Sequence, residues 1–177
     1  MAHYSRKDTK AGILLALLIV LLTTTSVLAT GDRLYVCKIG CEHSSIGSAV
    51  SAAESGDVII IEQGTYQENL KVDFDLTLSG TDQGEVTIKS NVEGRPAVVA
   101  GPRGIELMVS KLTVSGSRGA PADPESGEFP DGLSVRGEAK LTLSDVIITG
   151  NEACGVRLTD ESALETVSSS FSYNGTA

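Results

Sequence analysis

The feature that most constrains the fold is an internal repeat near the C-terminal end of the chain. Residues 132–151 (GLSVRGEAKLTLSDVIITGN) align with residues 155–174 (GVRLTDESALETVSSSFSYN) at a constant offset of 23. A fixed period of about 20 residues that carries several short strands is typical of a solenoid. We therefore predict that equivalent residues stack along one axis, about 4.8 Å apart. The expected pairs are Leu133 with Val156, Val135 with Leu158, Leu141 with Leu164, Ile148 with Phe171 and Asn151 with Asn174.

Short apolar segments recur along the rest of the chain. They are too short to form a stable meander alone, and the corners between them are too short for the helices of βαβ crossovers. The 19 glycines, the absence of Trp and the 4% of aromatic residues suit an aliphatic core with many tight corners. The sequence predicts an all-β fold, a single-stranded right-handed parallel β-helix. The expected strands include 58–61, 70–72, 76–78, 86–88, 98–99, 112–114, 141–143 and 146–148.

A short amphipathic helix is expected before the first of these coils. In the segment Ser44–Glu54, Ile46, Ala49, Val50 and Ala53 follow one another at helical spacing and form one apolar stripe. The β-branched run 58–61 comes next, and Gly64-Thr65-Tyr66 is expected to end that strand at a corner.

The segment Arg118–Pro130 is expected to leave the coil as a loop, because only then does the preceding coil fit the repeat. Its Pro, Gly and acidic content favours a solvated segment. The oxygen atoms of its acidic side chains could form a weak calcium site, but no fixed calcium-loop spacing is present, so a disordered, charged flap is the preferred interpretation. The acidic residues are Asp123, Glu125, Glu128 and Asp131.

The segment 1–29 is expected to be a secretory signal peptide. Arg6, Lys7 and Lys10 precede an uncharged run at 11–31, whose densely apolar part ends at Leu22. A membrane-spanning helix needs about 20 apolar residues, more than this stretch supplies, so cleavage after Ala29 is preferred over an uncleaved anchor. We predict a signal peptide at 1–29, a β-helix domain at 30–177, and a secreted, periplasmic or cell-surface protein without a membrane span after cleavage.

The charge of the chain limits its partners. The formal net charge is −9, and removal of the segment 1–29, with three basic residues and one acidic residue, changes it to −11. A surface this acidic argues against nucleic acid and against anionic membranes or polymers, unless cations bridge the two.

Two of the three cysteines are expected to pair. Cys37 and Cys41 lie four positions apart in a chain expected to reach a compartment that permits disulfides. A zinc site would need further ligands, and only His43 lies nearby. Cys154 is then left over, and we interpret it as a small buried side chain rather than a nucleophile.

The segment that begins at Ser45 resembles the start of pectin-lyase-like β-helix proteins, most closely pectin methylesterases and the carbohydrate-binding and sugar-hydrolase repeat proteins. The resemblance covers about residues 44–174 and implies a helix that covers the open N-terminal end of the coil. The resemblance implies that Tyr66 and Glu68, which match the G-x-Y-x-E element of the family, have a structural role at the first corner. The matching positions are Ser45-Ile46, Ala49-Val50, Ala53, Gly56-Asp57-Val58-Ile59, Gly64-Thr65-Tyr66, Glu68-Asn69 and 76–80.

The catalytic motifs of the family are absent from this sequence. The acidic motifs of the esterases and polygalacturonases and the W-x-D-H motif of the pectate lyases do not occur. Gly94-Arg95-Pro96 copies part of an esterase element without its Trp, and we interpret it as a corner. The resemblance therefore implies the fold, and no catalytic residue is carried over.

Several other residues are weighed as candidates. Asp73 and Asp75 point the same way on an extended segment, as metal-assisted polysaccharide cleavage would need, or they form the solvated side of a corner. Arg136, Lys140 and Arg157 could neutralise a uronate, although basic residues on strands often serve solubility. We expect Asn151 and Asn174 to form a structural ladder at a corner.

Three hypotheses of function follow from these observations. The preferred one is an exported module that binds carbohydrate or another surface polymer without intact catalytic motifs or a required cofactor. The second is a lyase or esterase whose site lies in further coils, because we expect the chain to be truncated after Asn174. The third is a structural surface spacer or adhesin fragment.

Overall fold

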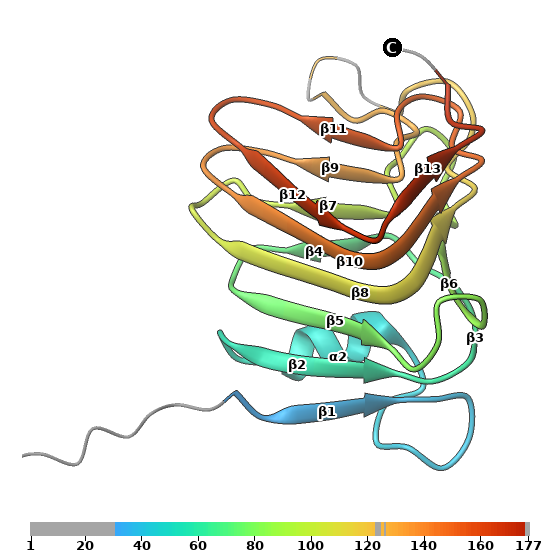
Figure 1. The fold of residues 1–177 in the computed structure, drawn as a ribbon, viewed down its shortest axis with the longest axis vertical. Helices are drawn as coiled ribbons and strands as arrows, with labels where there is room; N and C mark the ends of the chain where they lie inside the picture. Colours follow the sequence, from blue (N-terminus) through green and yellow to red (C-terminus); the bar gives the residue numbers. More distant parts are fainter. Residues whose placement is uncertain (1–30, 123–124, 126, 176–177) are drawn as a thin grey trace, which may run out of the picture.

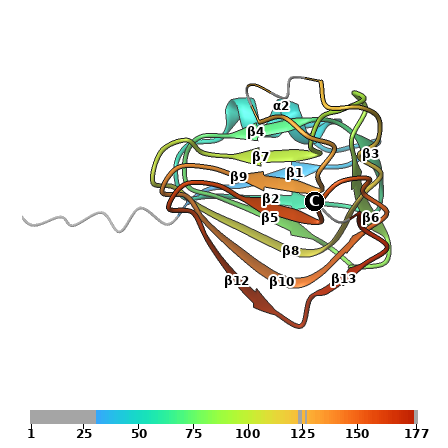
Figure 2. The same ribbon diagram turned by 90° about the horizontal axis from the view of Figure 1, so that it is seen from above.

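The computed structural model describes residues 31–122, 125 and 127–175, and these form a stack of short parallel strands (Figure 1). The strands belong to two sheets, which face each other across the core (Figure 2). The larger sheet contains β1 (Arg33–Val36), β2 (Asp57–Ile61), β3 (Gly64–Gln67), β5 (Leu76–Gly80), β6 (Val86–Lys89), β8 (Glu106–Ser115), β10 (Lys140–Thr149), β12 (Ala163–Val167) and β13 (Ser170–Ser172). The smaller sheet contains β4 (Leu70–Val72), β7 (Val98–Ala100), β9 (Leu133–Val135) and β11 (Val156–Leu158).

The order of the strands confirms the predicted right-handed parallel β-helix. The larger sheet runs β1-β2-β5-β8-β10-β12, with β3, β6 and β13 beyond a bend, and the smaller runs β11-β9-β7-β4. Every strand pairing among the described residues is parallel. Among these residues no helix has the length and apolar character needed to cross a membrane. The signal peptide predicted at 1–29 lies outside the described residues.

The predicted stacking of the two C-terminal copies is also confirmed. Leu141 lies opposite Leu164 and Ile148 opposite Phe171, at the offset of 23. Earlier coils differ in length, as the sequence separation between register partners shows. Val58 pairs with Thr77, whereas Leu107 pairs with the much more distant Leu141. The offset of 23 thus describes one coil, because the corners vary in length while the strands keep their register.

Aliphatic columns along the axis form the core. Leu76, Leu107 and Leu141 lie over one another, and each is at most 2% exposed. Because side chains alternate along a strand, the next residue of each triplet faces outward. Full burial of one such side chain contributes about 1.5–3 kcal/mol, so the stacked columns are the main source of stability.

The predicted helix is α2 (Ile46–Ala52), slightly shorter than the amphipathic segment suggested. It begins at Ser45, whose hydroxyl accepts a hydrogen bond from Ser48 N. The carboxylate of Glu68 accepts hydrogen bonds from Ile46 N (2.9 Å) and Gly47 N (2.7 Å). The helix contacts β1, β2 and β4, so it covers the N-terminal end of the coil.

The predicted break after the run 58–61 is present, but it lies at Glu62-Gln63, just before the expected segment Gly64-Thr65-Tyr66. These residues lie in β3, where Tyr66 faces Ile88 of β6 and is 1% exposed. Gly64 has φ of +150°, a conformation that glycine adopts readily, and the chain turns there without losing sheet hydrogen bonds. β2 ends at Ile61, and β3 begins at Gly64 itself, so the corner is shorter and earlier than expected.

Candidate functional site

A groove of about 300 Å³ lies over the outer face of the smaller sheet. Its floor includes Lys71 of β4 and Val99 of β7, which are register partners at outward positions. The sequence places them there because Leu70 and Val72, on either side of Lys71, are buried in the core. The groove is also lined by Asn69, Leu70, Arg95, Pro96, Gly101, Pro102, Glu128 and Arg136.

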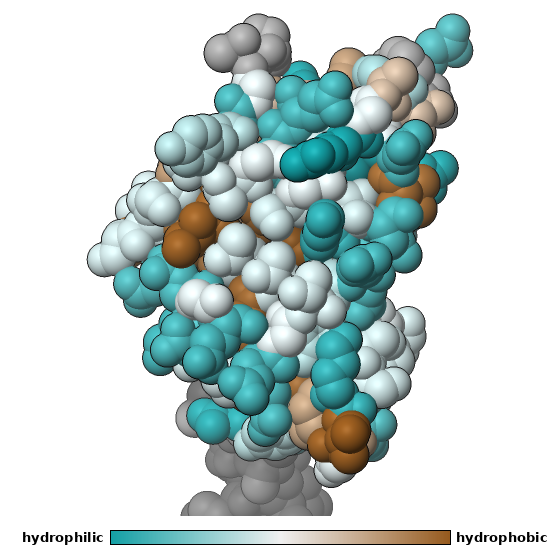
Figure 3. Space-filling view, turned by 90° about the vertical axis from the view of Figure 1, so that its right-hand side faces the viewer, coloured by the Kyte–Doolittle hydropathy of each residue, from teal (hydrophilic) through white to brown (hydrophobic). Residues whose placement is uncertain are grey.

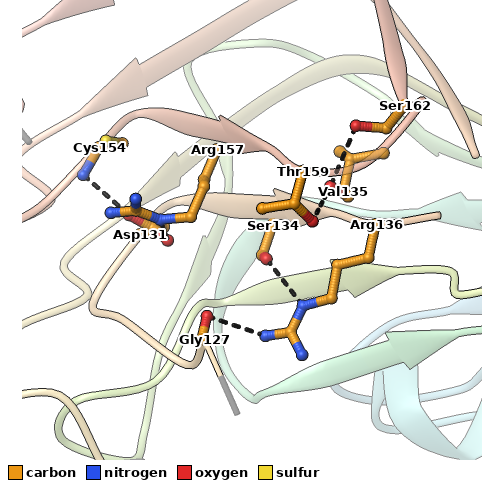
Figure 4. Close-up of polar contacts among 9 residues, drawn as sticks. All are labelled: Gly127, Asp131, Ser134, Val135, Arg136, Cys154, Arg157, Thr159 and Ser162. Atoms are coloured by element: carbon orange, nitrogen blue, oxygen red, sulfur yellow. Dashed lines mark hydrogen bonds and ion pairs between the residues drawn. The ribbon is translucent and has the colours of Figure 1, made fainter. Parts of the chain in front are cut away.

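One wall of the groove is the returning end of the loop 118–130, which we call the excursion. Arg95 binds the Glu128 carboxylate through Nε at 3.2 Å. Arg136 donates from Nη2 to Gly127 O (3.1 Å) and from Nε to the Ser134 hydroxyl (3.2 Å) (Figure 4). Arginines from two coils therefore hold this part of the excursion beside the sheet.

Asp131, a predicted calcium ligand, lies in a buried ion pair. Its carboxylate is 0% exposed and binds Arg157 at two points, 2.7 Å from Nε and 3.1 Å from Nη2, and it also accepts from Cys154 N at 2.9 Å (Figure 4). The hydrogen bond to Asp131 raises the pKa of Arg157 above its usual value. The guanidinium also stacks on the Phe129 ring, with 4.2 Å to its centroid.

Within the described residues, the other predicted acidic ligands form no group of three possible metal ligands. Glu125 and Glu128 lie in the described part of the excursion, whereas Asp123 lies outside the described residues. Glu128 is paired with Arg95 as described above, and both carboxylate oxygens of Asp131 already accept hydrogen bonds. Glu128 and Asp131 therefore have separate arginine partners and do not share a site.

Asp73 and Asp75 differ in their surroundings, although both are exposed after β4. Asp75 accepts from Glu106 N (2.9 Å) and from the Ser55 hydroxyl (3.3 Å). This carboxylate therefore links the corners of neighbouring coils. Asp73 lies on the solvent side of the same corner.

Asn151 and Asn174 lie over one another at a corner, and Asn151 Nδ2 donates to Asn174 Oδ1 at 2.9 Å. The column continues to Ser117, whose N donates to Asn151 Oδ1 (3.2 Å). In earlier coils Asn91 N donates to Asn69 Oδ1 (3.3 Å), a link between two further corner asparagines that the sequence analysis did not identify. Asn69 Nδ2 also donates to Pro96 O (2.6 Å), which fixes the amide at the edge of the groove.

The structure joins Cys37 and Cys41 in a disulfide, with 5.5 Å between their Cα atoms. Within the described part of the chain, one group of three possible metal ligands lies within 4.8 Å, and it consists of these cysteines and Glu62. The disulfide occupies both sulfur ligands of that group. Cys154 is a free thiol of intermediate exposure, which corrects the prediction of a buried side chain.

The outer face of the larger sheet differs in character from the groove. Its outward columns carry mainly Ser and Thr, and two hydroxyl pairs bond along the axis, Ser110 to Ser79 and Ser172 to Thr149, both at 3.1 Å. The side formed by β3, β6 and β13 mixes hydrophilic residues, residues of intermediate hydropathy and a few hydrophobic ones (Figure 3). Lys140, on this sheet, is paired with Glu165 at 3.1 Å.

The balance of charge within the groove is opposite to that of the whole chain. Among the described lining residues, Lys71, Arg95 and Arg136 are accompanied by one carboxylate, that of Glu128. The chain as a whole carries a formal charge of −9. The argument from net charge against anionic polymers therefore does not hold for this groove, because local charges within a cleft set its potential.

Comparison with solved structures bears on the fold. A pectin methylesterase bound to a hexasaccharide superposes with a TM-score of 0.57 at 18% identity, over 71% of this chain and 45% of that one. A pectin methylesterase from Erwinia chrysanthemi gives 0.56 at 17% identity, over 71% and 45%. A mutant pectin methylesterase with another hexasaccharide gives 0.55 at 19% identity, over 81% and 48%.

The chain has the β-helix fold of pectin methylesterases. At these identities the likeness concerns the fold alone, and the chain spans just under half of the length of these structures. No family model matches the sequence. No curated protein matches it either.

Proposed function

We propose that this protein is an exported β-helix module that binds an acidic carbohydrate segment in the groove over the smaller sheet. The observation that carries the proposal is the convergence of Lys71, Arg95 and Arg136, from successive coils, on one hollow of an acidic protein. Cations held close together by neighbouring coils attract a carboxylate and fix its position.

The other groups that line the groove also suit a sugar. Pro96, Pro102 and Val99 offer apolar surface, while the Asn69 amide and the Glu128 carboxylate add polar groups to the lining. Carbohydrate sites combine such apolar contact with a few fixed polar groups. The β-helix enzymes with a hexasaccharide bound support the same class of ligand by analogy of fold.

A direct test measures the affinity of the purified protein for a galacturonate hexasaccharide and for a neutral cellohexaose by calorimetry. We expect binding of the acidic sugar that weakens as salt is added. Lys71→Met should weaken it by up to about five-fold, since partly exposed charge pairs contribute up to about 1 kcal/mol. Lys89→Met makes the same change outside the groove, at the exposed last residue of β6, and should leave affinity unchanged.

Three outcomes would contradict the proposal. Turnover of the oligosaccharide would identify an enzyme instead. Absence of binding to either sugar would favour a structural spacer. Equal losses in Lys71→Met and Lys89→Met would show that the net charge of the protein, rather than the groove, determines the affinity.

A further inference from the structure

The carboxylate of Glu128 occupies the position within the groove where an anionic ligand would meet Arg95. The structure gives the pair a single contact, 3.2 Å between Arg95 Nε and Glu128 Oε2. A guanidinium offers five donors, so this contact uses only part of the binding capacity of Arg95. Glu128 therefore places a negative charge beside the donors that would recognise a carboxylate.

We propose that Glu128 determines the charge specificity of the groove by competing with the carboxylate of the ligand for Arg95; this inference rests on the proposed function. In the free protein Glu128 neutralises Arg95. A bound acidic sugar either displaces the Glu128 side chain or lies beside it against the repulsion of a like charge. A neutral sugar neither has to displace Glu128 nor is repelled by its charge.

The energetics of the pair favour competition over a permanent structural role. The side chains of Arg95 and Glu128 are 51% and 27% exposed. Ion pairs exposed to this extent contribute little to stability, because water screens both charges. A ligand carboxylate can therefore displace Glu128 at small cost, whereas the buried pair of Asp131 with Arg157 resists such exchange.

The backbone around Glu128 does not depend on this ion pair. On one side Gly127 O accepts from Arg136 (3.1 Å), and on the other the Phe129 ring stacks against Arg157. Asp131 N donates to Phe129 O (2.7 Å), which closes the turn into β9. The Glu128 side chain can thus leave Arg95 while neighbouring residues hold the main chain in place.

The test compares Glu128→Gln with the wild-type protein, using the galacturonate hexasaccharide and cellohexaose as probes in calorimetry. Glutamine keeps the size and polarity of the side chain but removes the charge. We expect the acidic probe to bind about two- to five-fold more tightly, the range that corresponds to the loss of one exposed charge pair. Affinity for the neutral probe should not change.

Glu85→Gln is the matched control, because it removes one negative charge at an exposed position outside the groove. It should change the affinity for the acidic probe by much less than Glu128→Gln does. Equal gains in both variants would overturn the inference, since the effect would then be one of net charge. Circular dichroism of both variants reports whether the fold is retained.

Further results would also overturn it. If Glu128→Gln weakens the binding of both probes, Glu128 contacts the ligand directly instead of competing with it. If the wild type binds the acidic probe and the variant binds it no better, the inference fails while the proposed function stands. If neither protein binds either probe, the proposed function fails and the inference with it.

Discussion

The two ends of the coil are covered to very different degrees. At the N-terminal end, α2 packs its buried Ile46, Ala49 and Val50 over the first coils. At the other end, Phe171 of the last described coil is 46% exposed, although its register partner Ile148 is 0% exposed. β11 and β12 are the terminal strands of the two sheet paths, and Figure 1 shows β11 above β9 at this end of the stack.

This difference shows that burial in a solenoid depends on neighbours along the axis. Leu141 has coils on both sides and is 0% exposed, whereas its register partner Leu164 has a described neighbour on one side and is only partly buried. Residues of equal size and equal place in the repeat therefore contribute unequally to stability. We therefore expect the last described coil to open locally more often than the middle coils.

The largest expected effect comes from truncating this pair of leucines. Leu141→Ala should lower the free energy of unfolding by about 2–5 kcal/mol, because it leaves a cavity in a closed core. Leu164→Ala should lower it by about 1 kcal/mol, since less apolar area is lost and water can fill the space. Urea denaturation measures both. Equal losses would show that the last coil is as well packed as the middle of the stack.

A smaller effect is expected at the covered end. Glu68→Ala removes the acceptor for Ile46 N and Gly47 N and should lower the free energy of unfolding by about 1–2 kcal/mol. Hydrogen exchange should increase first in α2 and its neighbours. Glu54→Ala, at an exposed position just after the helix, is the control. Loss of protection only in β12 and β13 would contradict this interpretation.

The smallest effect concerns Tyr66, which lies near the same end. Its hydroxyl donates to Glu62 O (2.9 Å), and Tyr66→Phe should lower the free energy of unfolding by about 1 kcal/mol near neutral pH. Burial, and then the charges of Glu62 and Glu68, raise the pKa of Tyr66 above 10.0. A raised pKa means that folding favours the neutral phenol.

This stabilisation is fully present below the pKa of the unfolded state, about 10, and is lost as the pH rises through the folded pKa. The wild type should therefore lose more stability than Tyr66→Phe when the pH is raised above about 10. Urea denaturation across this range tests the sign. A steeper loss in the variant would contradict the assignment of the shift to Tyr66.

The sequence is sufficient to predict the fold because the signals for it are local. Triplets such as Leu141-Thr142-Leu143 show the alternation of a strand, and one aligned repeat indicates stacking. The strand Arg33–Val36 is missed by this reasoning, although Leu34 and Val36 alternate with outward residues, because a single short segment carries little signal without its partner β2.

The groove could not be predicted in the same way. Lys71, Arg95 and Arg136 are far apart in sequence, and coils of unequal length conceal which positions coincide. The sequence places Arg95 in a corner, but it does not indicate that this corner forms one wall of the groove. The excursion is recognisable by its composition, whereas its contacts with Arg136 and Arg157 depend on tertiary structure.

The unequal length of the coils has a consequence for the history and redesign of such a protein. The chain between β8 and β10 includes the whole excursion, yet these strands keep a register as regular as that of β2 and β5, which a shorter segment connects. An insertion at a corner thus leaves the register of the neighbouring strands unchanged. New recognition segments could be grafted or exchanged there, and selection could vary the specificity of the molecule without rebuilding its frame.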